Sequence, residues 1–211
     1  MPLLSTLLVV AKAPVAGRVK TRLCPPCRPE EAAEIAAAAL ADTLDAVLCC
    51  SAERRLLALD GAPGDWLPAG FEVVPQHGDG LAERLGAAWT EVDGPCVQIG
   101  MDTPQVSPTC LDAALDRVTA GGSVLGPATD GGWWAIGMAR PVPWVFRGIP
   151  MSSPTTGALQ RAALAAHGLH PVLLPELCDI DTVDDAREVA ALIPHSRTAL
   201  TVDAVLGALA S

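Results

Sequence analysis

The sequence predicts an α/β domain of three layers, in which helices cover both faces of a mostly parallel sheet. Short apolar runs of the kind that form buried strands alternate along the chain with segments of helical period. The first run, residues 6–13, is almost continuously apolar, as expected for a strand covered on both faces. With 211 residues, half of them apolar, the chain is long enough for a sizeable core, and we expect residues 1–211 to form one domain.

The order of the expected elements follows from this alternation. The expected strands are residues 6–13, 54–60, 71–76, 95–101, 123–129, 132–138 and 170–177. The expected helices are residues 29–48, 80–92, 107–120, 153–168, 182–193 and 198–210. Pro29 opens the first helix and acidic residues follow it, as helix N-termini favour. Ser107 is placed to cap the third helix directly before Pro108, and Gly168 to end the fourth.

Positive charge is concentrated near the start of an acidic chain. The formal net charge is −10, which makes nucleic acid and anionic membrane surfaces poor partners. Residues 1–28 nevertheless carry both lysines of the chain and three arginines, with no Asp or Glu. Residues 13–28 form a loop longer than a usual strand-to-helix connection, and such loops are often functional. The asymmetry predicts a small anionic ligand held at one place.

The N-terminal residues and the cysteines indicate an intracellular setting. Residues 3–10 are apolar but too few to span a bilayer, and the positive charges follow them instead of preceding them as in a secretory signal. We therefore expect a cytoplasmic protein. The seven cysteines show no disulfide framework. Cys24 and Cys27 have the spacing of a zinc half-site or a redox pair, but no second pair follows, which favours a proline-stiffened loop with two free thiols.

Carboxylates follow several of the expected strands. Asp102, Asp130, Asp179 and Asp181 each come shortly after one. Ligands of parallel α/β sheets bind beyond the C-terminal ends of the strands, so one rim is expected to hold these carboxylates and the basic loop. The loop would supply positive donors for phosphates. The carboxylates would bind a hard divalent cation that neutralises charge on a leaving phosphate.

Structural roles compete with these functional ones. An Asp after a strand often caps a helix or forms a turn, and we interpret Asp79 and Asp185 in that way. Asp130 precedes two glycines, and shaping a hairpin between two strands is an equally good interpretation of it. The basic loop could be a solvated patch, but it has no nearby acid and follows the first strand, which favours binding. No phosphate-loop, dinucleotide or nucleophile-elbow motif is matched.

Five motifs in a fixed order are similar to those of a known family. The motifs are AKAPVAGRVKTRL, QHGDGLAERL, IGMDTPQVSP, GPATDGGWWAIGM and DIDTVDDA. On these the chain resembles the DUF2064 family of small bacterial glycosyltransferase-like proteins over nearly its whole length. The resemblance implies the Rossmann-like fold of nucleotide-diphospho-sugar transferases called GT-A. More distant relatives of that family include nucleotidyltransferases that activate molybdopterin or phospholactate.

The resemblance also implies roles for individual residues. Asp102 matches the metal-binding aspartate that replaces the DxD motif of other GT-A enzymes. Asp179 and Asp181 match the DIDT segment, and by analogy Asp181 is the favoured second metal contact. We expect Asp102, Asp130 and Lys20 to be catalytic, with Asp130 as the candidate general base. The residues implied to bind the nucleotide and its phosphates are Lys12, Ala13, Gly17, Arg18, Lys20, Thr21 and Arg22.

The acceptor side departs from the family pattern. Gly131 and Gly132 match a loop expected to line the acceptor, and Trp133 and Trp134 follow where the family usually has a pair containing Tyr. Met151 stands where many members have Trp. Neighbouring residues of a strand point to opposite faces, so one Trp is expected in the core and the other at the cleft.

Three functions fit these observations. The leading hypothesis is a glycosyltransferase that depends on Mg²⁺ or Mn²⁺ and moves a sugar from a nucleotide sugar to a small-molecule acceptor. The alternative is a nucleotidyltransferase that joins an NTP to a phosphorylated small molecule and releases pyrophosphate. A non-catalytic nucleotide-binding protein is the third, but it has little need of several carboxylates at the rim. The family resemblance favours the first.

Overall fold

The computed structural model describes residues 3–209. The strands are β1 (Thr6–Lys12), β2 (Arg54–Asp60), β3 (Glu72–Pro75), β4 (Cys96–Ile99), β5 (Ser123–Pro127), β6 (Trp133–Met138) and β7 (Val172–Leu173). The helices are α1 (Pro29–Leu48), α2 (Leu81–Trp89), α3 (Pro108–Thr119), α4 (Thr156–Ala166), α5 (Val183–Leu192) and α6 (Arg197–Leu209). Two short 3-10 helices are η1 (Thr21–Leu23) and η2 (Pro143–Phe146), which the sequence patterns did not predict.

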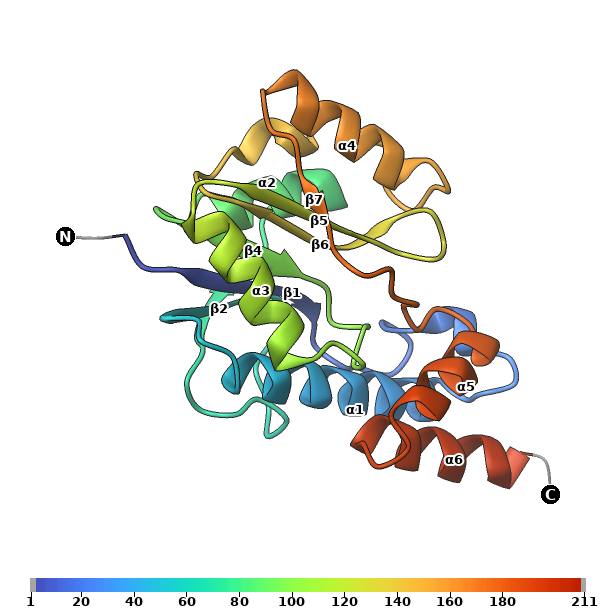
Figure 1. Ribbon diagram of the computed structural model, residues 1–211. Coiled ribbons are helices and arrows are strands. Elements are labelled where there is room, and N and C mark those ends of the chain that lie inside the picture. Colours follow the sequence, from blue (N-terminus) through green and yellow to red (C-terminus); the bar gives the residue numbers. More distant parts are fainter. Residues whose placement is uncertain (1–2, 210–211) are drawn as a thin grey trace.

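These strands form one sheet in the order β3-β2-β1-β4-β6-β5-β7 (Figure 1). Within residues 3–209, every neighbouring pair is parallel except the two pairs that contain β6. The prediction of an α/β fold with a mostly parallel sheet is confirmed. The C-terminal ends of β1 and β4 meet at the same edge of the sheet, because these strands are parallel neighbours.

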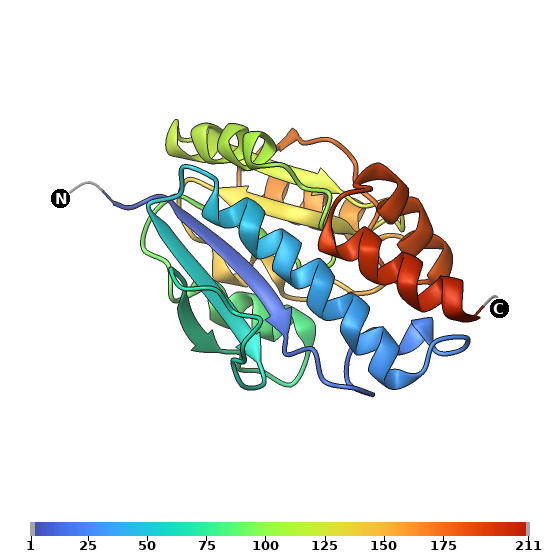
Figure 2. The ribbon, with the colours of Figure 1, turned by 90° about the horizontal axis from the view of Figure 1, so that it is seen from below.

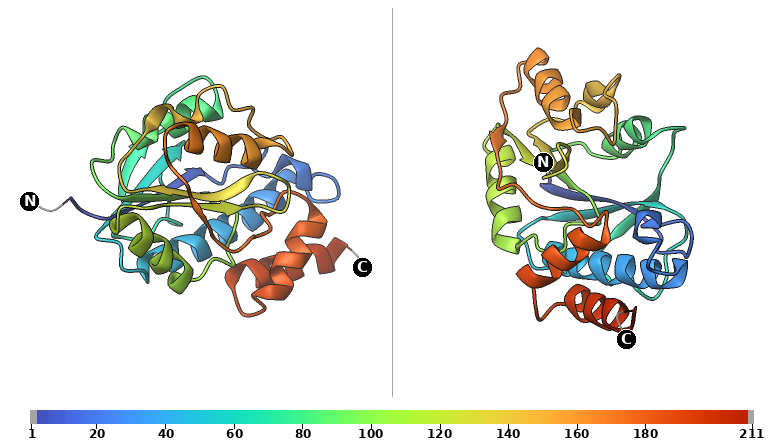
Figure 3. Two further views of the ribbon diagram at one scale, coloured as in Figure 1. Left: turned by 45° about the horizontal axis from the view of Figure 1, so that its top comes forward. Right: turned by 90° about the vertical axis from the view of Figure 1, so that its right-hand side faces the viewer.

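Alternation along the strands divides the core between the two faces of the sheet. Leu7 and Val9 of β1 pack in a cluster with α1 and α3, whereas Leu8 packs in a cluster with α2, η2 and α4. Figure 2 shows α1 and α3 side by side over one face, and Figure 3 shows α2 and α4 on the opposite side of the sheet from α1. Helices α5 and α6 pack on α1 in a separate cluster that also holds Leu23 and Cys27.

Helix ends match the local signals, while the last strand is shorter than expected. Ser107 Oγ accepts a hydrogen bond from Cys110 N at 3.2 Å, which is the predicted cap. Asp185 forms a capping box with Thr182 at the start of α5, which confirms the prediction that Asp185 caps a helix or forms a turn. Strand β7 has two residues instead of eight, because prolines flank it and both its side chains are exposed. None of the helices in residues 3–209 combines the length and apolar character needed to cross a membrane.

The two neighbouring tryptophans of β6 lie on opposite faces of the sheet, as the alternation predicts. Trp134 is 3% exposed, and its indole Nε1 donates to the Pro175 carbonyl at 2.9 Å. Its ring lies over Gly126, where a Cβ would come within 2.5 Å of the indole, so β5 needs glycine there. Trp133 is partly buried on the other face and stacks on Phe146 with ring centroids 6.1 Å apart.

Replacing Trp134 with Ala should destabilise the protein by about 3–5 kcal/mol, the usual cost of removing a large buried aromatic ring. Trp133→Ala should cost less, about 1–2 kcal/mol, because part of this ring is already exposed. Urea unfolding followed by far-UV circular dichroism measures both free energies. Equal losses for the two variants would contradict the assignment of one ring to the core and the other to the cavity.

Candidate functional site

A cavity of about 590 Å³ opens at the C-terminal edge of the sheet, bounded by the loop after β1, the β5–β6 hairpin and the segment before α4. The sequence-predicted residues that line it are Lys12, Arg18, Lys20, Thr21, Arg22, Asp102, Asp130, Gly132, Trp133, Asp179 and Asp181. Those that do not line it are Ala13, Gly17, Gly131 and Trp134. The rim expected from the strand order therefore exists, and it brings together residues that are far apart in the sequence.

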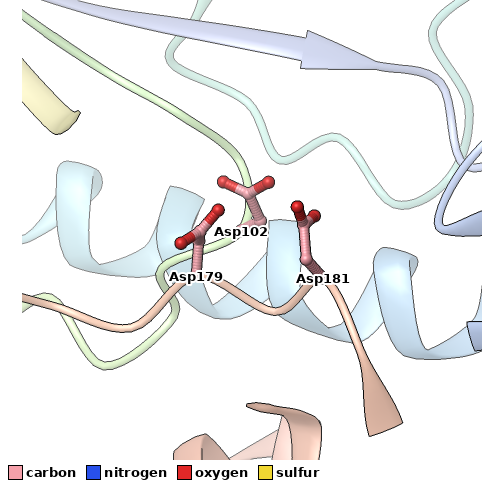
Figure 4. A group of neighbouring side chains, drawn as sticks. All are labelled: Asp102, Asp179 and Asp181. Atoms are coloured by element: carbon pink, nitrogen blue, oxygen red, sulfur yellow. The ribbon is translucent and has the colours of Figure 1, made fainter. Parts of the chain in front are cut away.

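Three aspartates form an acidic cluster in this cavity, called here the aspartate cluster: Asp102, Asp179 and Asp181. One carboxylate oxygen from each lies within 4.8 Å of the other two. Figure 4 shows that Asp102 comes from one loop, after β4, and the other two from a second loop, between β7 and α5. The backbone joins these loops directly, because Ile180 N donates to the Asp102 carbonyl at 3.0 Å.

Gln105 makes a second link between the same two loops. Its Nε2 donates to the Cys178 carbonyl at 2.6 Å, one residue before Asp179. Its Oε1 is buried without a hydrogen-bond partner among the described residues, and so is Thr103 Oγ1. The Gln105 side chain therefore makes its hydrogen bond through Nε2, and this bond fixes the position of the second loop relative to the first.

Lys20 provides a positive charge that contacts two members of the aspartate cluster. Its Nζ lies 2.8 Å from Asp102 Oδ2 and 3.3 Å from Asp181 Oδ1, and its side chain is only 9% exposed. Burial acts to lower the pKa of this ammonium, but the charges and hydrogen bonds of the two carboxylates outweigh burial and raise the pKa above its ordinary value. Its backbone lies in the left-handed region, with φ 46° and ψ 38°, which is uncommon for a residue other than glycine.

The remaining cations of the loop lie around this buried ammonium. The Arg22 guanidinium Nη1 also bonds Asp181, but its side chain is 64% exposed. Arg18 Nη2 lies 3.8 Å from Asp60 Oδ1, at the end of β2, in a looser contact. Lys12, Arg18, Lys20 and Arg22 all line the cavity, so the end of β1 and the loop after it bring four cationic residues to one space.

Asp179 is the member of the cluster whose charge is least well compensated. Burial, together with the charges of Asp102, Asp130 and Asp181, raises its pKa to about 7. Three carboxylates held this close together offer the oxygen ligands that Mg²⁺ and Mn²⁺ prefer. The residues present therefore fit a divalent cation.

Asp130 forms the turn of the β5–β6 hairpin, as its structural interpretation predicted. Asp130 Oδ1 accepts a hydrogen bond from Gly132 N at 2.7 Å, two residues on, as in an Asx turn. Gly131 has φ 86°, and a Cβ there would lie 2.2 Å from the Pro154 carbonyl, so this glycine allows the hairpin to touch the segment before α4. The Asp130 carboxylate still lines the cavity, so the two interpretations of this residue are compatible.

Several lining residues were not found by sequence reasoning. Gln98 is 1% exposed and accepts from Trp89 Nε1 at 2.6 Å, and Gln76 Nε2 donates to the Ala11 and Ala58 carbonyls. The sequence signal that could have identified Gln98 is the presence of a polar residue within the apolar run of β4. The hydroxyl-rich segment before α4, including Ser153, was interpreted only as the start of a helix, although it borders the cavity.

Charge is divided unevenly across the cavity. Its four described cations all belong to β1 or to the loop after it. Across the sheet, beyond β4, the cavity is lined by the hairpin, the segment before α4 and the first residue of α4. They contribute acidic, apolar and hydroxyl groups, represented by Asp130, Trp133, Met151, Ser153 and Thr156. One half of the cavity is therefore suited to an anion and the other half to an uncharged group.

Fold and site together define an α/β protein with a basic loop facing an acidic cluster at the edge of its sheet. The chain belongs to the family described as "Uncharacterized protein conserved in bacteria (DUF2064)", whose model matches residues 34–153, more than half of the chain. The resemblance to this family is thus confirmed, and the matched residues contain the second, third and fourth of the five motifs. A comparison with proteins of curated function finds no match.

Solved structures with the same fold include transferases. A proposed nucleotide-diphospho-sugar transferase from Desulfovibrio desulfuricans G20 is 25% identical, with a TM-score of 0.85 over 97% of this chain and 96% of that one. Rv0371c from Mycobacterium tuberculosis H37Rv, in complex with manganese, is 24% identical, with a TM-score of 0.56 over 88% and 97%. CMP:2-keto-3-deoxy-manno-octonic acid synthetase with CTP is 13% identical, with a TM-score of 0.59 over 90% and 98%. These likenesses agree with the GT-A-like fold expected from the sequence.

Gln105→Leu should weaken Mn²⁺ binding by about 10-fold or more, because outer partners that orient metal ligands typically contribute that much. Gln160→Leu is the matched control: Gln160 Nε2 also donates to a carbonyl, that of Val145, and its Oε1 is also buried without a partner among the described residues. Gln160 does not line the cavity. Titration followed by electron paramagnetic resonance measures free Mn²⁺. A similar loss of Mn²⁺ affinity in both variants would contradict a positioning role for Gln105.

Proposed function

We propose that this protein is a metal-dependent glycosyltransferase that moves a sugar from a nucleotide-diphosphate donor to a small-molecule acceptor. The observation that carries the proposal is the meeting of four cations and three carboxylates in one cavity at the edge of the sheet. The likeness to the Desulfovibrio protein, itself described as a proposed nucleotide-diphospho-sugar transferase, supports a nucleotide-sugar donor. The likeness to a manganese complex supports a divalent cation.

On this proposal, the chain's own groups bind the donor phosphates from two sides. Asp102, Asp179 and Asp181 would hold Mg²⁺ or Mn²⁺, which neutralises charge on the departing diphosphate when it is bound. Lys12, Arg18 and the other cations of the loop bind phosphate oxygens. Positive groups on both sides of the diphosphate stabilise the charge that develops as the bond to the sugar breaks.

Asp130 is the group we assign to the acceptor. The hydrogen bond from Gly132 N to its Oδ1 fixes the orientation of the carboxylate at the edge of the cavity. Its Oδ2 would accept the proton of the acceptor hydroxyl as the oxygen attacks the sugar. The ring of Trp133, held against Phe146, provides an apolar surface beside this carboxylate for the acceptor.

A nucleotidyltransferase is the second candidate. The fold shared with the CTP-bound synthetase favours it, as do four cations that suit a triphosphate. Its acceptor, however, would be phosphorylated, and the described hairpin half of the cavity offers that phosphate an aspartate and no lysine or arginine. This division of charge supports sugar transfer to an uncharged acceptor.

Product analysis separates these candidates. Nucleotide sugars and NTPs are screened by thermal shift with and without Mn²⁺, since a ligand of the native state raises the melting temperature. Compounds that bind are then incubated with mixtures of hydroxyl and phosphate acceptors. Release of nucleoside diphosphate supports the glycosyltransferase, release of pyrophosphate supports the nucleotidyltransferase, and binding without turnover supports a non-catalytic binding protein.

Asp102→Asn should keep the fold but lose metal-enhanced nucleotide binding and at least about 100-fold in turnover, roughly 2.7 kcal/mol of barrier. If Asp102 only formed a turn, Asn would serve nearly as well, because it makes the same local hydrogen bonds. Asp79→Asn is the control, since Asp79 lies outside the cavity lining. Steady-state kinetics and calorimetry with and without Mn²⁺ give the comparison. Near-normal metal dependence in Asp102→Asn would place the metal elsewhere.

A further inference from the structure

We infer that Lys20 occupies the cation position of the aspartate cluster in the metal-free protein, and that it moves to the donor phosphates when a metal binds. The metal and the nucleotide would then bind cooperatively, each favouring the other through one lysine. The inference rests on the proposed function for the identity of the two ligands. The inference adds to the proposed function a mechanism that couples metal binding to phosphate binding.

The geometry of Lys20 is that of a counter-ion inside the cluster. A single ammonium bridges Asp102 Oδ2 and Asp181 Oδ1, which come from the two loops that the Ile180–Asp102 hydrogen bond joins. Its side chain is 9% exposed, whereas that of Arg22, which contacts only Asp181, is 64% exposed. Lys20 thus neutralises the cluster from within and Arg22 from its edge.

A divalent ion held by the cluster needs oxygens of the same carboxylates. The three carboxylates offer one oxygen each within 4.8 Å, and Lys20 contacts two of the three residues. An ammonium bonded to two of these carboxylates repels an incoming cation and occupies lone pairs that the cation could otherwise use. Metal binding to the free protein is therefore opposed by Lys20, although the cluster itself favours a cation.

The cavity gives Lys20 another place to bond. Lys20 lines the same space as Lys12, Arg18 and Arg22, where we propose that the donor phosphates lie. A long, flexible side chain can turn its ammonium from a carboxylate to a phosphate without moving the backbone. Once a phosphate accepts the ammonium, the cluster is free for the metal. Linkage requires the converse, so bound metal strengthens phosphate binding by the same factor.

The inference predicts that one substitution changes the two affinities in opposite directions. Lys20→Met removes the charge and keeps an unbranched side chain of similar length. It should bind Mn²⁺ about 10-fold or more tightly than the wild type when no nucleotide is present, because a competing cation is gone. The same variant should bind inorganic pyrophosphate, in the absence of metal, about 10-fold more weakly.

Two further variants make the test specific. Arg22→Met is the matched control and should change Mn²⁺ affinity much less, since Arg22 contacts the cluster only at its edge. Lys20→Gln repeats the removal of charge with a polar side chain, in case Met disturbs the loop. Mn²⁺ is titrated by electron paramagnetic resonance, pyrophosphate by calorimetry, and folding of each full-length variant is checked by thermal unfolding.

Each outcome has a defined meaning. Tighter Mn²⁺ binding with weaker pyrophosphate binding in both Lys20 variants supports the inference. Equal Mn²⁺ affinity in the wild type and both variants would overturn it while leaving the proposed metal site intact. Loss of both affinities would assign Lys20 a structural role and also overturn it. Absence of Mn²⁺ binding in every protein, including the wild type, would contradict the metal-dependent function itself.

Discussion

Like charges held close together are the constraint on which the rest of this site depends. Three carboxylates lie within 4.8 Å of one another. Two such charges repel by roughly 3–4 kcal/mol at an effective dielectric constant near 20. The fold does not let them separate, because the Ile180–Asp102 hydrogen bond and the bond from Gln105 to the Cys178 carbonyl join the two loops that carry them. A positive charge beside the cluster therefore stabilises it.

The basic loop supplies this positive charge, and its unusual features follow from that role. The Lys20 side chain is only 9% exposed, which is rare for a lysine unless it is paired, and its backbone has a positive φ. Both features place one ammonium between carboxylates of two loops. Strained backbone at such a position is typical of functional sites, where surrounding contacts hold the conformation. The uneven distribution of charge follows as well, because the cations lie beside β1 and the hairpin half contains none among the described residues.

Much of the fold and part of the site could be predicted from the sequence. Buried strands show as apolar runs, and the position of Asp102 directly after such a run predicts that this residue lies at the C-terminal edge of the sheet. The contact between Lys20 and Asp102 spans 82 residues, so no local pattern encodes it. The topology of a parallel sheet placed both residues at one rim, but it did not predict their contact. Gln105 could not be found at all, because its role depends on the Cys178 carbonyl, 73 residues away. Strand alternation predicted that one of the two neighbouring tryptophans faces the cavity, but that Trp134 is the buried one depends on its close approach to Gly126.

The central claim is that the aspartate cluster is a divalent-cation site facing a phosphate-binding loop. The most direct test is anomalous scattering from crystals grown with MnCl₂ and a nucleoside diphosphate. The account predicts an anomalous peak among the carboxylates of Asp102, Asp179 and Asp181, with the Lys20 ammonium bonded to a phosphate oxygen. A structure with nucleotide bound, no manganese peak at the cluster and Lys20 still on Asp102 would contradict it.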